Sequence, residues 1–213
     1  MTGPSTPPGA QSHRISVVRT GQSEVLRETR KAIFLDRDGT IIKDVGYIKN
    51  PDDVSLMPGA AMALRVAHNV QRPVFVVTNQ SGIARGLVTQ EEYVAVRRRT
   101  GELLAEFGAF VDAEYVCPHH PDFTGPCECR KPGVLLYEQA MREHGIDGAS
   151  SAFIGDRWRD VAPALHYGGT GILVPTATTP PDEIARAQVE AHVAPTLLAA
   201  IEAAVIHVPP NLQ

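Results

Sequence analysis

The sequence predicts an α/β fold built on a doubly wound, Rossmann-like parallel sheet. Three short apolar runs, rich in β-branched and aromatic residues, lie at 33–35, 74–77 and 152–154. Continuous apolar runs of this length are typical of parallel strands that are buried on both faces. Stretches with helical periodicity separate the runs, and strands that alternate with helices form a parallel sheet through right-handed crossovers.

The strands are expected at 31–35, 74–77, 113–116, 152–154 and 171–174, with a short extended piece near 192–193. The first, second and fourth of these runs end directly in polar residues. In open α/β sheets the ligand site lies at the carboxyl ends of the strands, so these three ends are candidates for a functional site. A further edge strand is considered at 15–18, on a weaker pattern.

The helices are expected at about 58–70, 89–107, 132–144, 158–167 and 196–204, with another that begins near 182. Thr89 followed by Glu92 is a capping-box pattern, which fixes the start of the second helix. Gly145 is a typical residue after the last turn of a helix and ends the third. Asp182 is expected to cap the helix that follows it.

Length and composition limit the classes of protein that this chain can belong to. Its 213 residues suit a single domain at 31–206, between a flexible N-terminal extension (1–30) and a C-terminal tail (207–213). The net charge of −4 gives no field that attracts nucleic acid or an anionic membrane. We expect a cytoplasmic monomer that binds neither, because the sequence shows no secretory signal and no disulfide framework.

The end of the first strand carries a pair of carboxylates. Asp36 and Asp38 follow the run Ile33-Phe34-Leu35, and Gly39 permits a sharp turn beyond them. A strand alternates its faces, so the two aspartates leave it on the same side. Paired carboxylates repel unless a cation relieves them, and oxygen ligands suit Mg²⁺. An acidic Asp-Gly turn without any catalytic role is the alternative reading of this pattern.

Further polar residues recur where the other strands end. Thr78 follows the second strand, Asp156 and Asp160 follow the fourth, and Lys131 lies in a connecting loop. Each has an ordinary explanation as a helix cap, a surface charge or a first-turn acid. Because parallel strands bring their carboxyl ends to one edge of the sheet, the set instead predicts one shared site.

All three cysteines lie within thirteen residues, as Cys117, Cys127 and Cys129. His119 and His120 lie in the same loop. Three thiolates and one imidazole complete a tetrahedral Zn²⁺ site with no open position for water, which is the arrangement of a structural site. Plain reduced thiols remain an alternative, and either histidine could be the fourth ligand.

The ordered motifs resemble those of the haloacid dehalogenase superfamily, phosphatase branch. They are Asp36-Arg37-Asp38-Gly39-Thr40, Thr78-Asn79, Lys131-Pro132 and Gly155-Asp156 with Asp160, and the resemblance spans about residues 32 to 175. Within this superfamily the run 78–86 and the cysteine loop are most similar to the heptose bisphosphate phosphatases. Histidinol-phosphate phosphatases share a Cys/His loop but usually carry Asp where this chain has Ser81. DNA 3′-phosphatases lack the cysteine loop.

The resemblance implies a role for each motif. Asp36 would be the nucleophile, and Asp38 the acid and base. Mg²⁺ would be held by the Asp36 carboxylate, the Asp38 main-chain carbonyl and Asp156. Thr78, Arg130 and Lys131 would hold the phosphoryl group, while Asp160 orients this apparatus. The implied zinc ligands are Cys117, His119, Cys127 and Cys129.

The resemblance also implies a substrate and the surface that binds it. The residues expected to bind substrate are Asp44, Tyr47, Asn79, Gln80, Ser81 and Arg157, the last of these for a second phosphate. The 40–73 segment is too short for a separate cap domain, so specificity would come from loops. We expect an Mg²⁺-dependent phosphatase for a heptose 1,7-bisphosphate. Histidinol phosphate is the alternative substrate, and a non-catalytic phospho-sugar-binding protein is the alternative class.

Overall fold

A six-stranded parallel sheet forms the centre of the molecule in the computed structural model, which describes residues 30–206. The strand order is β3-β2-β1-β4-β5-β6, and each neighbouring pair is parallel. The edge strand considered at 15–18 and both terminal segments lie outside the described residues, apart from residue 30. The strands are β1 (Ile33–Leu35), β2 (Val74–Asn79), β3 (Ala113–Cys117), β4 (Ala152–Gly155), β5 (Thr170–Leu173) and β6 (His192–Val193).

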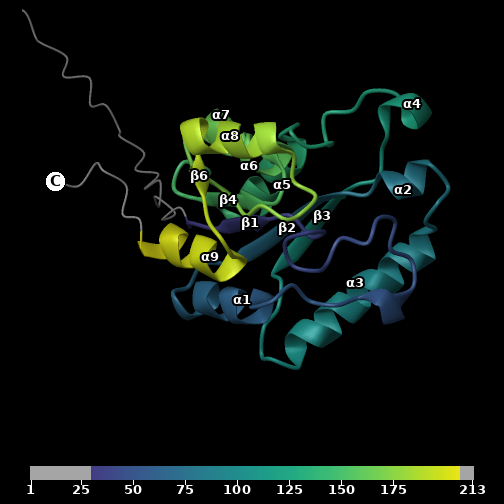
Figure 1. Ribbon diagram of the computed structural model, residues 1–213, viewed down its shortest axis with the longest axis horizontal. Coiled ribbons are helices and arrows are strands. Elements are labelled where there is room, and N and C mark those ends of the chain that lie inside the picture. Colours follow the sequence, from purple (N-terminus) through teal and green to yellow (C-terminus); the bar gives the residue numbers. More distant parts are fainter. Residues whose placement is uncertain (1–29, 207–213) are drawn as a thin grey trace, which may run out of the picture.

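Helices cover both faces of this sheet, which confirms the doubly wound α/β fold (Figure 1). One face packs against α1, α3 and α9, and the other against α5 and α7. The helices are α1 (Ala60–Asn69), α2 (Ser81–Ala84), α3 (Gln90–Ala105), α4 (Pro121–Thr124), α5 (Leu135–His144), α6 (Trp158–Val161), α7 (Pro163–Tyr167), α8 (Pro181–Glu190) and α9 (Leu197–Ile206), with the 3-10 helix η1 (Pro51–Asp53).

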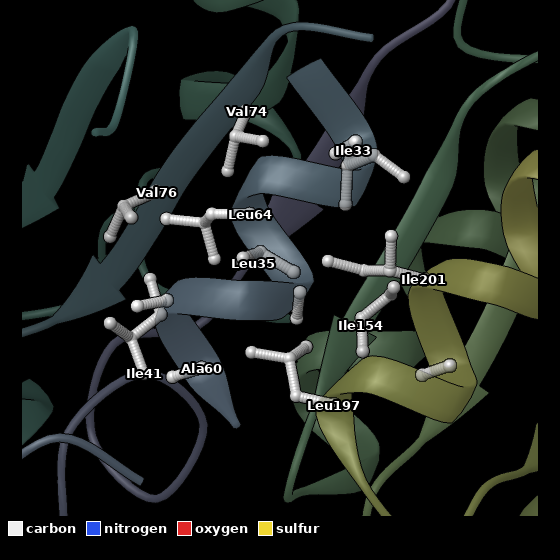
Figure 2. Close-up of a cluster of buried hydrophobic side chains, with 14 of the residues drawn as sticks. Ile33, Leu35, Ile41, Ala60, Leu64, Val74, Val76, Ile154, Leu197 and Ile201 are labelled. Carbon is white, nitrogen blue, oxygen red and sulfur yellow. The ribbon is translucent and has the colours of Figure 1, made fainter. Parts of the chain in front are cut away.

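Alternation along the central strands divides the core into two chemically different halves. Ile33 and Leu35 of β1 face an aliphatic cluster that includes Leu64 of α1 and Ile201 of α9 (Figure 2). Phe34 faces the opposite way, 5.0 Å from the ring centroid of Phe153 and 5.7 Å from that of Phe75. Both faces are apolar because each carries helices, which explains the continuous apolar runs in the sequence.

Most boundaries agree with the sequence, and the exceptions have local causes. The predicted capping box at Thr89 and Glu92 is present at the start of α3. The predicted helix at 158–167 is wrong as one piece, because Pro163 has no N–H to donate and begins a separate helix, α7. The helix expected from 132 begins only at Leu135. Asp182 lies in the first turn of α8, and Pro180 occupies the cap position.

The connections leave the carboxyl edge of the sheet uncovered by a second domain. The segment between β1 and β2 holds only η1 and α1, and the segment between β2 and β3 holds α2 and α3. The prediction that no separate cap domain is inserted is therefore confirmed for the described residues.

No helix within residues 30–206 is both long and apolar enough to cross a membrane.

The aliphatic half of the core gives a stability prediction. Leu64 is fully buried on α1, whereas Met62 on the same helix is about half exposed. Leu64→Ala should lower the free energy of unfolding by about 2–5 kcal/mol, because it removes buried methyl groups and leaves a cavity. Met62→Ala should change it by about 0.5 kcal/mol or less. Urea denaturation of both variants measures the difference, and equal losses would contradict this packing.

Candidate active site

The parallel strands deliver acidic side chains to one edge of the sheet, as the sequence predicts. Asp36 follows β1 directly, and its N–H donates to the carbonyl of Ile154 in β4 at 3.0 Å. Asp156 follows β4, so the two carboxylates lie side by side. Gly39 lies close to Asp156 and has a φ of 79°. A Cβ at this position would lie 2.6 Å from Asp156 Oδ2. Glycine is therefore required both by the backbone conformation and by the close approach.

A buried lysine joins these acids to the rest of the site. Lys131 Nζ lies 2.8 Å from Asp36 Oδ1 and 2.7 Å from Asp160 Oδ1. It also donates to the carbonyl of Val77 in β2 at 2.6 Å. Burial alone would lower the pKa of Lys131, but the charges of Asp160 and Asp36 raise it above its ordinary value. The ammonium therefore remains charged in the interior.

The carboxylates outnumber this one ammonium. Ligand oxygens of Asp36, Asp156 and Asp160 all lie within 4.8 Å of one another. Burial, together with the charges of Asp160 and Asp36, raises the pKa of Asp156 to about 7. Asp156 Oδ1 is buried and has no hydrogen-bond partner among the described residues. This donor set fits a divalent cation with oxygen ligands, which would relieve the repulsion and supply the missing partner.

Asn79 and Gln80 order the site from the end of β2. Asn79 Oδ1 accepts from Lys131 N at 3.0 Å, and its Nδ2 donates to Lys131 O at 3.2 Å. This pair of bonds fixes the backbone that carries the ammonium. Gln80 Nε2 donates to Asp38 Oδ2 at 2.7 Å and to Thr78 Oγ1 at 2.9 Å. Both residues were expected to bind substrate; their side chains make these internal contacts, and both also line the cavity described next.

A cavity of about 340 Å³ opens over the acids. Its wall includes five of the predicted substrate-binding residues and both predicted catalytic aspartates. Thr78, Arg130 and Lys131 are not among its lining residues. The lining residues are Asp36, Asp38, Asp44, Gly46, Tyr47, Asn79, Gln80, Ser81, Gly82 and Arg159.

The arginines near the site differ from the sequence-based expectation. The Arg157 guanidinium donates to both carboxylate oxygens of Glu183, at 3.0 and 2.6 Å. Arg159, two residues later, lines the cavity, and its Nε is buried with no hydrogen-bond partner within the described part of the chain. Arg130 Nη1 donates to the carbonyl of His119 at 3.3 Å and so connects the lysine loop to the cysteine loop. Sequence reasoning did not consider Arg159.

Arg37 is a second residue that the sequence did not single out. Its side chain is 2% exposed and forms an ion pair with Asp38 at 3.1 Å. In the sequence, Arg37 is marked only by its position between two aspartates. Strand alternation predicts that its side chain points away from both of them. The sequence therefore does not predict the ion pair with Asp38, which forms because the backbone turns at Gly39.

The cysteine loop gathers four potential metal ligands. Ligand atoms of Cys117, His119, Cys127 and Cys129 lie within 4.8 Å of one another. His119 Nδ1 is 3.2 Å from Cys129 Sγ, whereas His120 Nδ1 accepts from the N–H of Asp122. Of the two histidines that the sequence left open, the structure therefore places His119 with the thiols.

A parallel sheet with an acid pair after β1 and a lysine beside it is the architecture of haloacid dehalogenase-like hydrolases. The family model described as HAD-hydrolase-like matches residues 128–200. A protein from Yersinia pestis, D-glycero-beta-D-manno-heptose-1,7-bisphosphate 7-phosphatase, is 43% identical over 153 residues, which are 68% of this chain and 80% of that protein. The relative of the corresponding name from Chlorobaculum tepidum is 39% identical over 160 residues, 70% of this chain and 80% of its own length.

A solved structure agrees with these sequence relatives. It is D,D-heptose 1,7-bisphosphate phosphatase from B. bronchiseptica, complexed with magnesium and phosphate. The match has 32% identity and a TM-score of 0.74, and it covers 84% of this chain and 99% of the other. The chain therefore belongs to the haloacid dehalogenase-like phosphatases, in the family of these heptose bisphosphate phosphatases.

The contacts of Asn79 give a prediction about this site. Asn79→Ala removes both hydrogen bonds to the Lys131 backbone and should lower phosphatase kcat by about 10- to 100-fold, because small displacements of a catalytic group are costly. Asn50→Ala is the matched control, since the Asn50 side chain caps η1 and does not line the cavity. Steady-state phosphate release measures both variants. Equal activity of the two variants would show that the position of Lys131 does not depend on its hydrogen bonds with Asn79.

Proposed function

We propose that this chain hydrolyses the 7-phosphate of D-glycero-D-manno-heptose 1,7-bisphosphate in an Mg²⁺-dependent reaction. The observation that carries this proposal is the convergence of Asp36, Asp156 and Lys131 at the carboxyl edge of the sheet. Relatives named for this activity support the choice of substrate. The two relatives described above are not named for histidinol phosphate, the alternative substrate.

The proposed reaction proceeds in two displacements. In the first, a carboxylate oxygen of Asp36 attacks phosphorus, the bond from phosphorus to the sugar oxygen breaks, and the Asp38 carboxyl protonates that oxygen. In the second, Asp38 takes a proton from water while the water oxygen attacks phosphorus. The bond from phosphorus to Asp36 then breaks, and phosphate leaves with both aspartates restored.

The surrounding residues would hold the phosphoryl group through this sequence. Lys131 lies against Asp36 and would meet a phosphoryl oxygen with its ammonium. Thr78 Oγ1 accepts from Gln80 and so retains its hydroxyl proton to donate. Mg²⁺, held by the Asp36 carboxylate, the Asp38 carbonyl and Asp156, would offset the charge that accumulates on these oxygens. Asp160 would orient Lys131.

The proposal is tested by phosphate release from heptose 1,7-bisphosphate, fructose 1,6-bisphosphate and histidinol phosphate. The heptose substrate should have the highest kcat/KM. Asp36→Asn should abolish turnover of every substrate, because the nucleophile is lost, while thermal melting shows an intact fold. Higher kcat/KM for histidinol phosphate would overturn the assignment, and turnover by Asp36→Asn would overturn the covalent mechanism.

The non-reacting phosphate of a bisphosphate requires a positive group outside the Lys131 centre. The sequence assigned this role to Arg157, but the cavity favours Arg159, which lines it and whose buried Nε has no hydrogen bond in the described residues and lies 3.8 Å from Asp160 Oδ1. Arg157, whose guanidinium is engaged by Glu183, would instead fix the start of α6. Asp44, Tyr47 and Ser81 would contact the sugar between the two phosphates.

Comparison of the two arginines tests this division of roles. Arg159→Met should lower kcat/KM for heptose 1,7-bisphosphate by at least about tenfold, or about 1.4 kcal/mol, because the remote phosphate loses its partner. It should leave 4-nitrophenyl phosphate, which has no second phosphate, within about threefold. Arg157→Met should have the smaller effect on the bisphosphate. The reverse order would restore Arg157 to the role that the sequence gave it.

We also propose that the cysteine loop binds one structural Zn²⁺ through Cys117, His119, Cys127 and Cys129. The four side chains form a complete set with no open position, and Arg130 connects the loop to the catalytic lysine. Three thiolate ligands require reducing surroundings, so the cytoplasm is the proposed location.

Elemental analysis tests the zinc proposal. Purified protein should contain about one zinc per chain, and His119→Ala should lower this content because one of four ligands is lost. His120→Ala is the matched control and should retain the metal, since its ring contacts Asp122 instead. Protein without zinc, or zinc loss only in the His120 variant, would contradict the ligand set.

A further inference from the structure

Arg37 holds the carboxylate of Asp38 from within the protein. Its Nε and Nη2 each lie 3.1 to 3.3 Å from both Asp38 oxygens. Gln80 Nε2 adds a third donor, 2.7 Å from Asp38 Oδ2. The Asp38 side chain is 21% exposed, so without these donors it would be free to turn into solvent.

The guanidinium is itself held by the edge of the sheet. Its Cζ lies 5.3 Å from the centroid of the Tyr93 ring on α3, a cation–π contact. The Tyr93 hydroxyl donates to Glu114 of β3, and Glu114 forms an ion pair with Arg97 at 3.0 Å. This chain of contacts holds Arg37, which does not line the cavity over the acids, whereas Asp38 does.

Arg37 is a costly residue to bury. Its Nη1 has no hydrogen-bond partner among the described residues. A buried charged group with an unsatisfied donor destabilises the fold, and an apolar side chain of similar volume would avoid that cost. Stability alone therefore does not explain an arginine at this position.

We propose that Arg37 is a positioning residue that aims Asp38 at the reacting oxygens in both proton transfers. The inference rests on the acid–base role proposed for Asp38, but not on the identity of the sugar. When Asp38 carries the proton, its other oxygen still accepts from Arg37. After the proton passes to the ester oxygen, both oxygens accept from Arg37, and the carboxylate stays in place to take the proton of the attacking water.

Esters that differ in leaving-group basicity separate this role from a structural one. Phenyl phosphate needs a proton on its leaving oxygen far more than 4-nitrophenyl phosphate does. Arg37→Met should lower kcat/KM for phenyl phosphate by at least about 30-fold, within the usual range for proton transfer, and that for 4-nitrophenyl phosphate by no more than about threefold. Rapid mixing with the nitrophenyl ester should show a burst of about one product per site, because the second proton transfer becomes slow.

Two further variants complete the test. Arg37→Lys keeps the charge but lacks the two parallel N–H groups. Its kcat/KM should therefore also fall more for phenyl phosphate than for the nitrophenyl ester, but by a smaller factor than in Arg37→Met. Arg37→Lys also serves if Arg37→Met fails to fold, as thermal melting would reveal. Arg98→Met is the charge-matched control, because Arg98 is exposed and pairs with Glu102 on the same helix. Equal losses for both esters, or no loss for either, in the folded Arg37 variants would overturn the proposal.

Discussion

The ammonium of Lys131 is the contact on which the rest of this site depends. It touches a carboxylate after β1, a carbonyl of β2 and a carboxylate of α6, so three elements meet at one atom. Removing it would leave Asp36 and Asp160 as buried neighbours with only the longer contact from Arg159 to Asp160, at 3.8 Å, to offset their charge. Such a loss is far more costly than an unpaired charge at the surface. Two hydrogen bonds between the Asn79 amide and the Lys131 backbone hold the residue that carries this ammonium.

The charges of the site divide into two groups that serve different steps. Asp36, Asp156 and Asp160 lie together, and their nearby positive groups are Lys131 and, 3.8 Å from Asp160, Arg159. Three carboxylates outnumber these two cations, so this group favours a bound metal ion. Asp38 has its own counter-charge in Arg37 and stands outside that group. The separation allows one aspartate to exchange protons while its neighbour two residues earlier remains in the negative cluster.

The sequence predicts the parts of this structure that depend on local patterning. Continuous apolar runs identify the strands, and polar residues at their ends identify Asp36, Thr78 and Asp156, because a parallel sheet brings those ends together. The close spacing of the three cysteines and His119 in the sequence is enough to predict that their side chains lie together. The break at Pro163 was not predicted, although proline cannot continue a helix without losing a hydrogen bond.

Partners that are distant in the sequence were not predictable in the same way. Arg157 and Arg159 are both arginines near the start of α6, and the position of Glu183 in α8 decides that Arg157 forms the bidentate pair while Arg159 lines the cavity. Asn79 follows Thr78 in a motif, yet its amide contacts the backbone of Lys131, 52 residues away. These side-chain partners depend on how distant elements pack against each other, so the residue pattern of a single segment does not predict them.

The close spacing of Cys129 and Lys131 has a consequence for how the chain responds to its surroundings. One intervening residue, Arg130, separates a thiol of the proposed zinc cluster from the lysine that contacts Asp36, and Arg130 donates a hydrogen bond back to the cysteine loop. An oxidant that reaches the thiols would therefore disturb the proposed phosphate-binding centre without reacting with any of its carboxylates. Oxidation of the thiols and loss of zinc would then act on the same short segment, residues 127–131. Activity lost in either way would return on reduction of the thiols and renewed binding of zinc.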